Sequence, residues 1–161
     1  MAEQGSALSS PVITPEQLRE HWQGHRKLTR RMIEAFPEKE LFEYSIGKMR
    51  TFAQLTAEFL SMAVPTLIGI TSRKWPESEV EKATTKEGLL KLWDANTAEI
   101  DRLWKEIPEE RFQEVDTAFG QWQMPIFGLL LYVIDNEIHH RGQGYVYLRS
   151  LGIEPPPFYE R

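Results

Sequence analysis

The 161-residue sequence contains no cysteine, and this absence excludes several kinds of chemistry. Disulfide bonds, thiolate nucleophiles and cysteine-ligated zinc all require a thiol that the chain does not have. Any thiol in a reaction must therefore come from another molecule. A chain without cysteine suits a reducing compartment, and we expect the protein to be cytoplasmic.

The sequence also lacks an excess of positive charge and a long apolar run. Its 19 lysine and arginine residues are outnumbered by 24 acidic residues, which gives a formal net charge of −5. Proteins that bind nucleic acids usually carry a concentrated basic face, so we expect no nucleic-acid partner. We find no secretory leader pattern and no stretch of about 20 apolar residues, and we therefore expect no membrane span.

What the sequence does contain is helical periodicity. Four long amphipathic helices are predicted over 15–36, 48–70, 85–107 and 125–151. Thr14, Pro15 and Gln17 form a capping-box pattern at the start of the first, whereas Pro65 is expected to kink or break the second. Residues 71–85 are expected to form a long crossover, and 109–124 a loop or short extended piece. The fold is predicted to be an all-α four-helix bundle over 14–161, preceded by a flexible arm over 1–13.

The last predicted helix carries an unusual concentration of polar residues, from Asp135 through Gln143. Asn136 and His140 are four residues apart and share a helix face, the spacing by which bundles present metal ligands inward. On a facing helix, Glu58 points inward or lies at the boundary of the core. The residues alone leave two interpretations open: a hydrogen-bonded polar cluster in the core, or a metal site.

Other polar residues near this stretch have simpler interpretations. His139 is predicted to lie on the surface or at a dimer contact, because it falls one residue off the inner line. His21 and His25 are four residues apart, but both cannot occupy the apolar stripe, and only His25 is expected to face the core. Glu137 and Arg141 have the spacing of a helical ion pair.

The string from Asp135 to Gln143, with its continuation from Tyr145 to Arg149 and from Leu151 to Pro156, closely resembles the DinB/YfiT-like superfamily. The segment from Met49 to Leu55 resembles the entry to that family's second helix, and the resemblance extends over the chain from Glu16 onward. It implies a four-helix bundle, commonly a homodimer, with a nickel or zinc ion held by three histidines.

Only one of the three histidine ligands that the resemblance implies is a histidine here. The motif's final ligand matches His140, whereas the ligand one turn earlier falls on Asn136 and the second-helix ligand on Glu58. Carboxylate and imidazole groups bind zinc, nickel or manganese, but a neutral amide is a weak ligand. We therefore expect weak metal binding, a preference for a harder cation, or no metal. Without metal, the three residues would form a buried hydrogen-bonded cluster.

Three classes of function follow from these observations. Relatives resemble metal-dependent enzymes that transfer low-molecular-weight thiols; in such a reaction His140 and Glu58 would ligate the metal, Asn136 would orient a ligand or substrate, and Glu137 would be a supporting partner or base. The alternative is a metal-free pocket that binds a small molecule without turnover. A third is a stress-related interaction protein, damage-inducible as the family name implies. No catalytic residue is assigned by the sequence.

Overall fold

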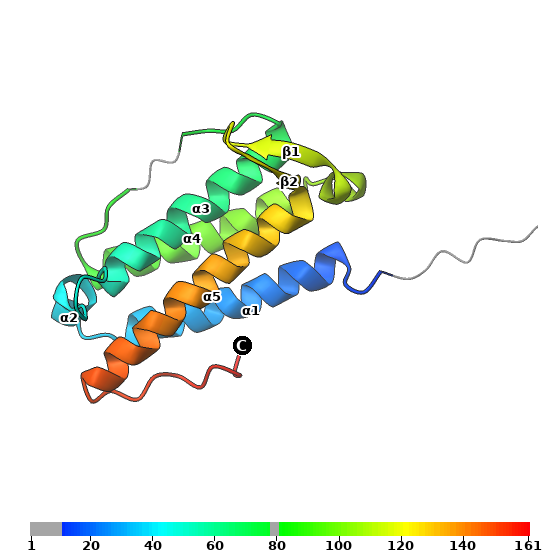
Figure 1. The fold of residues 1–161 in the computed structure, drawn as a ribbon. Helices are drawn as coiled ribbons and strands as arrows, with labels where there is room; N and C mark the ends of the chain where they lie inside the picture. Colours follow the sequence, from blue (N-terminus) through cyan, green and yellow to red (C-terminus); the bar gives the residue numbers. More distant parts are fainter. Residues whose placement is uncertain (1–10, 78–80) are drawn as a thin grey trace, which may run out of the picture.

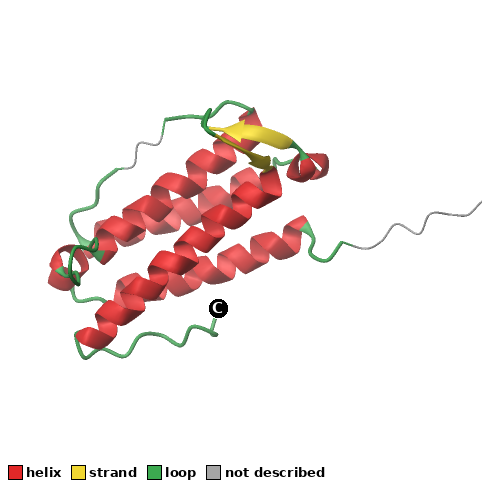
Figure 2. Ribbon diagram, in the orientation of Figure 1, coloured by secondary structure: helices red, strands yellow, loops and turns green. Residues whose placement is uncertain are grey.

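The computed structural model describes residues 11–77 and 81–161, which form a largely helical domain (Figures 1 and 2). The predicted arm over 1–13 lies mostly outside the described residues. Four long helices lie side by side, and shorter elements cover their ends. The elements in chain order are α1 (Pro15–Ala35), α2 (Glu38–Glu43), α3 (Phe52–Ser72), α4 (Lys86–Trp104), the 3-10 helix η1 (Glu109–Gln113), β1 (Val115–Ala118), β2 (Trp122–Pro125) and α5 (Ile126–Ser150).

Local sequence signals set where the long helices begin. The predicted capping box at the start of α1 is confirmed, because the Thr14 side chain accepts from the Gln17 backbone and the Gln17 side chain accepts from Thr14. A second capping box, which the sequence reading overlooked, starts α3 with Thr51 and Gln54. Each box satisfies backbone N–H groups that a helix start would otherwise leave without acceptors.

Three expectations about individual segments need correction. The second predicted helix begins at Phe52 rather than 48, and it continues through Pro65 to Ser72 without a break. The linker after α1 contains the short helix α2. The segment 109–124 holds η1 and most of an antiparallel hairpin, in which Val115 pairs with Pro125 and Ala118 with Trp122. Packing on both sides of α3 outweighs the one backbone hydrogen bond that a proline removes.

Among the described helices, α3 alone has the length and composition of a membrane span, with a mean hydropathy of 1.3 over its most apolar stretch. Half of that stretch is buried inside the protein, where α3 packs against α4 and α5. The sequence-based expectation overlooked this helix as a candidate. Its burial is that of a core helix in a soluble domain.

A polar layer divides the core into two apolar clusters. One cluster, at the hairpin end, contains Trp22, Leu67 and Ile134; the other, at the α2 end, contains Met32, Trp93 and Leu148. Between them, each long helix contributes polar side chains at the same level of the bundle. These are His25, Arg26 and Thr29 of α1, Glu58 of α3, Asn96 and Thr97 of α4, and Asn136, Glu137, His140 and Arg141 of α5.

The close approach of α3 and α5 depends on a glycine. A Cβ atom added at Gly144 would lie 2.4 Å from the ring of Phe52, which is fully buried. We expect Gly144→Ala to lower the free energy of unfolding by about 1–3 kcal/mol, because the Phe52 ring must shift within a packed core. Urea unfolding followed by circular dichroism measures this change.

Gly142→Ala is the matched control for this substitution, because Gly142 lies on the same helix, is exposed, and has open space where a Cβ would go. It should be neutral or stabilising by up to about 1 kcal/mol, since alanine favours the helix. Equal effects of the two substitutions would contradict the proposed contact.

Candidate functional site

The structure brings together the three residues that the sequence selected. Asn136 Nδ2 of α5 donates to Glu58 Oε1 of α3 at 3.0 Å. His140 Nε2, one turn further along α5, lies 3.4 Å from the same oxygen. The Glu58 and His140 side chains are only 24% and 17% exposed, so Glu58 lies at the boundary of the core. The three side chains form one cluster in the polar layer.

Glu58 is held as a carboxylate by its neighbours. Partial burial alone would raise its pKa, but hydrogen bonds from Arg50 and Asn136 and the positive charge of Arg50 outweigh that effect and lower the pKa below its ordinary value. Arg50 pairs with Oε2, which leaves Oε1 facing Asn136 and His140. Arg50 lies outside the helical spacing of the motif, and no periodic signal in the sequence connects it with Glu58.

The surroundings of His140 orient its ring. Its Nδ1 lies 3.3 Å from Gln143 Oε1, and its ring stacks on Phe59 with 6.3 Å between the ring centres. When Nδ1–H donates to Gln143, a neutral ring presents the lone pair of Nε2 toward Glu58 Oε1. Two lone pairs then face each other, and either a proton on Nε2 or a cation between the two atoms removes the repulsion.

Two donor atoms of the cluster have the separation that two ligands of one divalent cation would have. Two ligand atoms of one tetrahedral zinc ion lie roughly 3.3–3.5 Å apart, which matches the separation of His140 Nε2 and Glu58 Oε1. Asn136 Oδ1 is buried without a hydrogen-bond donor among the described residues, so it is available as a third oxygen ligand. Within the same residues, no group of three His, Cys, Asp or Glu side chains is placed to hold a metal. The set is therefore two strong ligands and one weak one.

Glu137 does not join this cluster, contrary to its expected role as a supporting partner or base. It is 2% exposed, accepts a 2.5 Å hydrogen bond from Thr29 Oγ1, and lies 3.6 Å from Arg26 Nη1. Both partners belong to α1, on a different side of α5 from Glu58. Successive residues of a helix differ by about 100° in direction, which separates Glu137 from Asn136.

The expected ion pair between Glu137 and Arg141 is replaced by contacts of Arg141 with α1. Arg141 donates to the His25 backbone carbonyl at 3.1 Å and to Thr29 Oγ1 at 3.2 Å, and its Nη2 lies 3.0 Å from His25 Nδ1. Arg161, at the end of the chain, lies 3.0 Å from the other ring nitrogen of His25. His25 is buried as predicted, whereas His21 and His139 are exposed.

Acid is expected to destabilise the folded protein through His25, which is buried and lies beside two arginines. Burial, followed by the charges of Arg141, His21 and Arg161, lowers the pKa of His25 to about 3. The folded protein therefore disfavours the imidazolium, whereas the unfolded chain accepts a proton near pH 6.5. The contribution of neutral His25 to the free energy of unfolding is fully present above about pH 6.5. It is lost as the pH falls toward 3, with a slope of up to about 1.4 kcal/mol per pH unit.

We expect His25→Gln to reduce that slope, measured as the free energy of urea unfolding at several values between pH 4 and 7. His139→Gln, which changes an exposed histidine of α5 that is not among the groups lowering the pKa of His25, should leave the slope as in the parent protein. Identical slopes in the parent protein and His25→Gln would contradict the assignment.

Comparisons with known proteins identify the family and the fold. The DinB family model matches residues 7–161. The uncharacterized protein YjoA of Bacillus subtilis is 23% identical over 149 residues, covering 90% of this chain and 96% of its own length. The crystal structure of a DinB-like protein from Bacillus cereus has a TM-score of 0.72 at 22% identity, covering 89% and 97% of the two chains. That of B. subtilis YjoA has a TM-score of 0.69 at 21% identity, covering 90% and 99%. The chain belongs to the DinB family.

Proposed function

We propose that Glu58, Asn136 and His140 form a low-affinity divalent-cation site at the polar end of a small-molecule pocket. The observation that carries this proposal is the convergence of His140 Nε2 and Glu58 Oε1 at 3.4 Å beside a buried amide oxygen to which none of the described residues donates. Nickel, zinc and manganese are the candidate ions, because the donor set combines one imidazole with oxygen ligands.

The contacts of each ligand support the same reading. Arg50 binds the Glu58 oxygen that faces away from His140, and Gln143 accepts from the far side of the imidazole. Outer partners of this kind orient ligands and select the histidine tautomer in known metal sites. His140 and Glu58 would hold the ion, and Asn136 would orient a ligand or substrate.

Transfer of a low-molecular-weight thiol is the reaction that we propose for a cation-loaded site. The cation would supply the positive charge that lowers the pKa of an external thiol and makes it a nucleophile, which a chain without cysteine cannot provide itself. Of the chain's own residues, Glu58 stays ionised and accepts hydrogen bonds, which suits it to binding and orienting rather than to donating a proton.

A metal-free small-molecule site is the second candidate. The hydrogen bond from Asn136 and the ion pair with Arg50 already satisfy both oxygens of Glu58, which favours a cluster that is stable without a cation. The two candidates differ in their response to a chelator. Ligand binding that is unchanged by a chelator favours the metal-free site, and joint loss of cation and ligand favours the cation site.

The remaining features that we propose concern assembly and cellular context. We propose a four-helix bundle of the DinB/YfiT-like type, with the long crossover between α3 and α4, that acts as a cytoplasmic homodimer in a stress response. Light scattering coupled to size exclusion measures the mass in solution, and a monomer would contradict the dimer.

The cation site is tested by calorimetric titration of the purified protein with nickel, zinc and manganese salts, together with elemental analysis. We expect about one equivalent of bound ion, lost in both His140→Ala and Glu58→Ala. Asn136→His should bind zinc or nickel about tenfold or more tightly, because an imidazole replaces a weak amide ligand.

His139→Ala is the matched control for this titration, since His139 is an exposed histidine adjacent to His140. It should bind the cation as the parent protein does. If the parent protein binds none of the three ions, or if His139→Ala removes binding as fully as His140→Ala, the cation site is wrong.

A further inference from the structure

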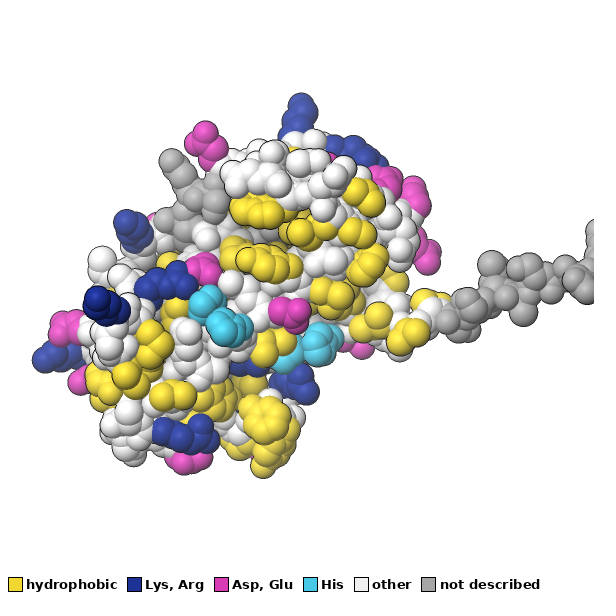
Figure 3. Space-filling model, in the orientation of Figure 1, with side chains coloured by type: hydrophobic (Ala, Val, Ile, Leu, Met, Phe, Trp, Pro, Cys, Tyr) yellow, Lys and Arg dark blue, Asp and Glu magenta, His cyan; other side chains and the backbone are white. Residues whose placement is uncertain are grey.

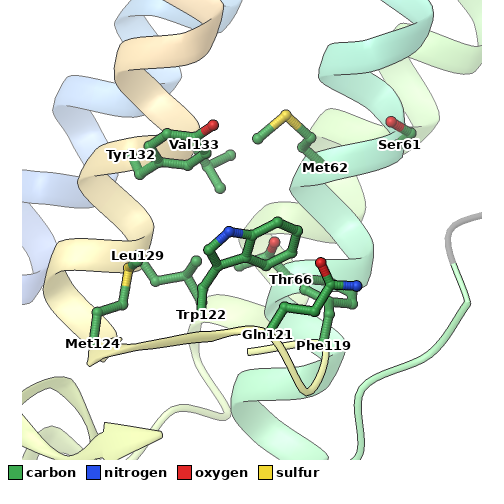
Figure 4. Close-up of a pocket in the computed structure, with 10 residues that line it drawn as sticks. All are labelled: Ser61, Met62, Thr66, Phe119, Gln121, Trp122, Met124, Leu129, Tyr132 and Val133. Atoms are coloured by element: carbon green, nitrogen blue, oxygen red, sulfur yellow. The ribbon is translucent and has the colours of Figure 1, made fainter. Parts of the chain in front are cut away.

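An open pocket lies between α3, α5 and the β1–β2 hairpin (Figure 4). Glu58, Asn136 and His140 are not among its lining residues. Its volume is about 460 Å³, within the range of about 300–1,000 Å³ that is usual for small-molecule sites. The lining residues come from three elements and the hairpin turn. They are Ser61, Met62, Thr66, Phe119, Gln121, Trp122, Met124, Leu129, Tyr132 and Val133.

The lining is uncharged and mostly apolar. None of the described residues that line it is acidic or basic, and its polar members are hydroxyl and amide side chains. Figure 4 shows the Trp122 ring in the gap between the two helices, with Met62 and Tyr132 on opposite walls. Aromatic and thioether side chains give adaptable, polarisable walls that suit a flat apolar molecule.

Two large side chains of this pocket remain accessible to solvent. Trp122 is 52% exposed and Tyr132 is 58% exposed. Figure 3 shows hydrophobic side chains gathered over the hairpin and the start of α5 on this face of the protein. Exposed apolar surface that is grouped around a cavity is typical of a binding site.

A chain of aromatic contacts holds the hairpin wall in place. The Trp75 ring packs on Gly69 of α3, where an added Cβ would lie 2.0 Å from it. Phe119 lies 5.1 Å from Trp75, and Trp122 lies 6.3 Å from Phe119, measured between ring centres. Phe119 has a φ of 52°, a conformation that bulky residues rarely adopt, so surrounding contacts must maintain it. The wall is therefore preformed.

The pocket and the polar cluster follow one another along the same two helices. Met62 lies one turn after Glu58 on α3, and Tyr132 lies one turn before Asn136 on α5. One helical turn of four residues advances by about 6 Å, which is the span of a small molecule. A ligand can thus occupy the apolar pocket and reach the polar cluster with one end.

We infer that this pocket binds the uncharged, apolar body of a small molecule whose single polar group reaches Glu58, Asn136 and His140. An aromatic body fits the walls best, because Phe119, Trp122 and Tyr132 present ring surfaces. Only the contact with the polar group rests on the proposed function. Binding of the apolar body depends on the pocket alone.

Two fluorescent probes with the same ring system test the pocket in the metal-free full chain. N-phenyl-1-naphthylamine is uncharged, and 8-anilino-1-naphthalenesulfonate carries a sulfonate on the same body. The uncharged probe should bind with enhanced fluorescence, and the sulfonate about tenfold or more weakly, because the lining that the structure describes contains no cationic side chain. Trp122→Ala and Met62→Ala should each weaken binding of the uncharged probe, the former by about tenfold or more.

Phe127→Ala is the matched control, because Phe127 is an exposed aromatic residue of α5 that lines a different groove with Ile13 and Leu131. It should bind the uncharged probe as the parent protein does. Thermal unfolding of each variant confirms that it is folded.

The outcomes separate this pocket from the cation site. Probe binding without any cation binding supports the pocket while overturning the proposed cation. Failure of the parent protein to bind the uncharged probe, or equal binding by Trp122→Ala, overturns the pocket whatever the cation titration gives. Loss of both probe and dimer in Trp122→Ala would also overturn it, since the face would then be an interface between two copies.

Discussion

The buried carboxylate of Glu137 fixes the orientation of α5, and the candidate site depends on that orientation. A carboxylate that is 2% exposed is stable only when charged and polar partners compensate for its lost hydration, and Arg26 and Thr29 of α1 provide them. With Glu137 directed at α1, the helix turn places Asn136 and His140 toward Glu58 of α3.

Arg26 extends this constraint to a third helix. Its guanidinium lies 3.4 Å from the centre of the Trp93 ring and donates to Asn96 and Thr97 of α4. Burial lowers the pKa of Arg26 to about 10, so it still carries its charge at neutral pH and can compensate Glu137. The polar layer thus connects α1, α4 and α5. These helices cannot shift along one another within the apolar packing on either side without separating the polar partners.

Sequence reasoning predicted the features that depend on local signals. The cap at Thr14 and the helical class follow from capping and spacing, which act within a few residues. The meeting of Glu58 with Asn136 and His140 was implied by the family resemblance, because these residues lie on different helices. Reasoning from spacing placed Glu137 at the site, because helical periodicity identifies a buried face without saying which neighbouring helix it meets. Only the position of α1 relative to α5 decides that Glu137 joins Arg26.

Other features lay beyond periodicity for a different reason. Arg26 is fully buried, although arginine usually marks the exposed side of a helix. Its burial could not be predicted from periodicity, because the partners that compensate its charge are distant in sequence. The hairpin that forms one wall of the pocket has strands of four residues, too short for an alternating pattern to stand out. Its position depends on the Trp75 ring, which packs on Gly69. No pattern in the sequence predicts this contact.

The division of the polar layer into two parts explains how a ligand set can change without loss of the fold. Arg26, Glu137 and Arg141 are buried and hold the helices together, whereas Glu58 and His140 are partly exposed and are coupled mainly to each other, Arg50 and Gln143. Replacing a residue of the first group leaves a buried charge without its partner, but replacing one of the second leaves groups that water can reach. A glutamate can therefore stand at position 58, where the family resemblance implies a histidine, while the fold keeps its likeness to DinB-like structures at a TM-score of 0.72.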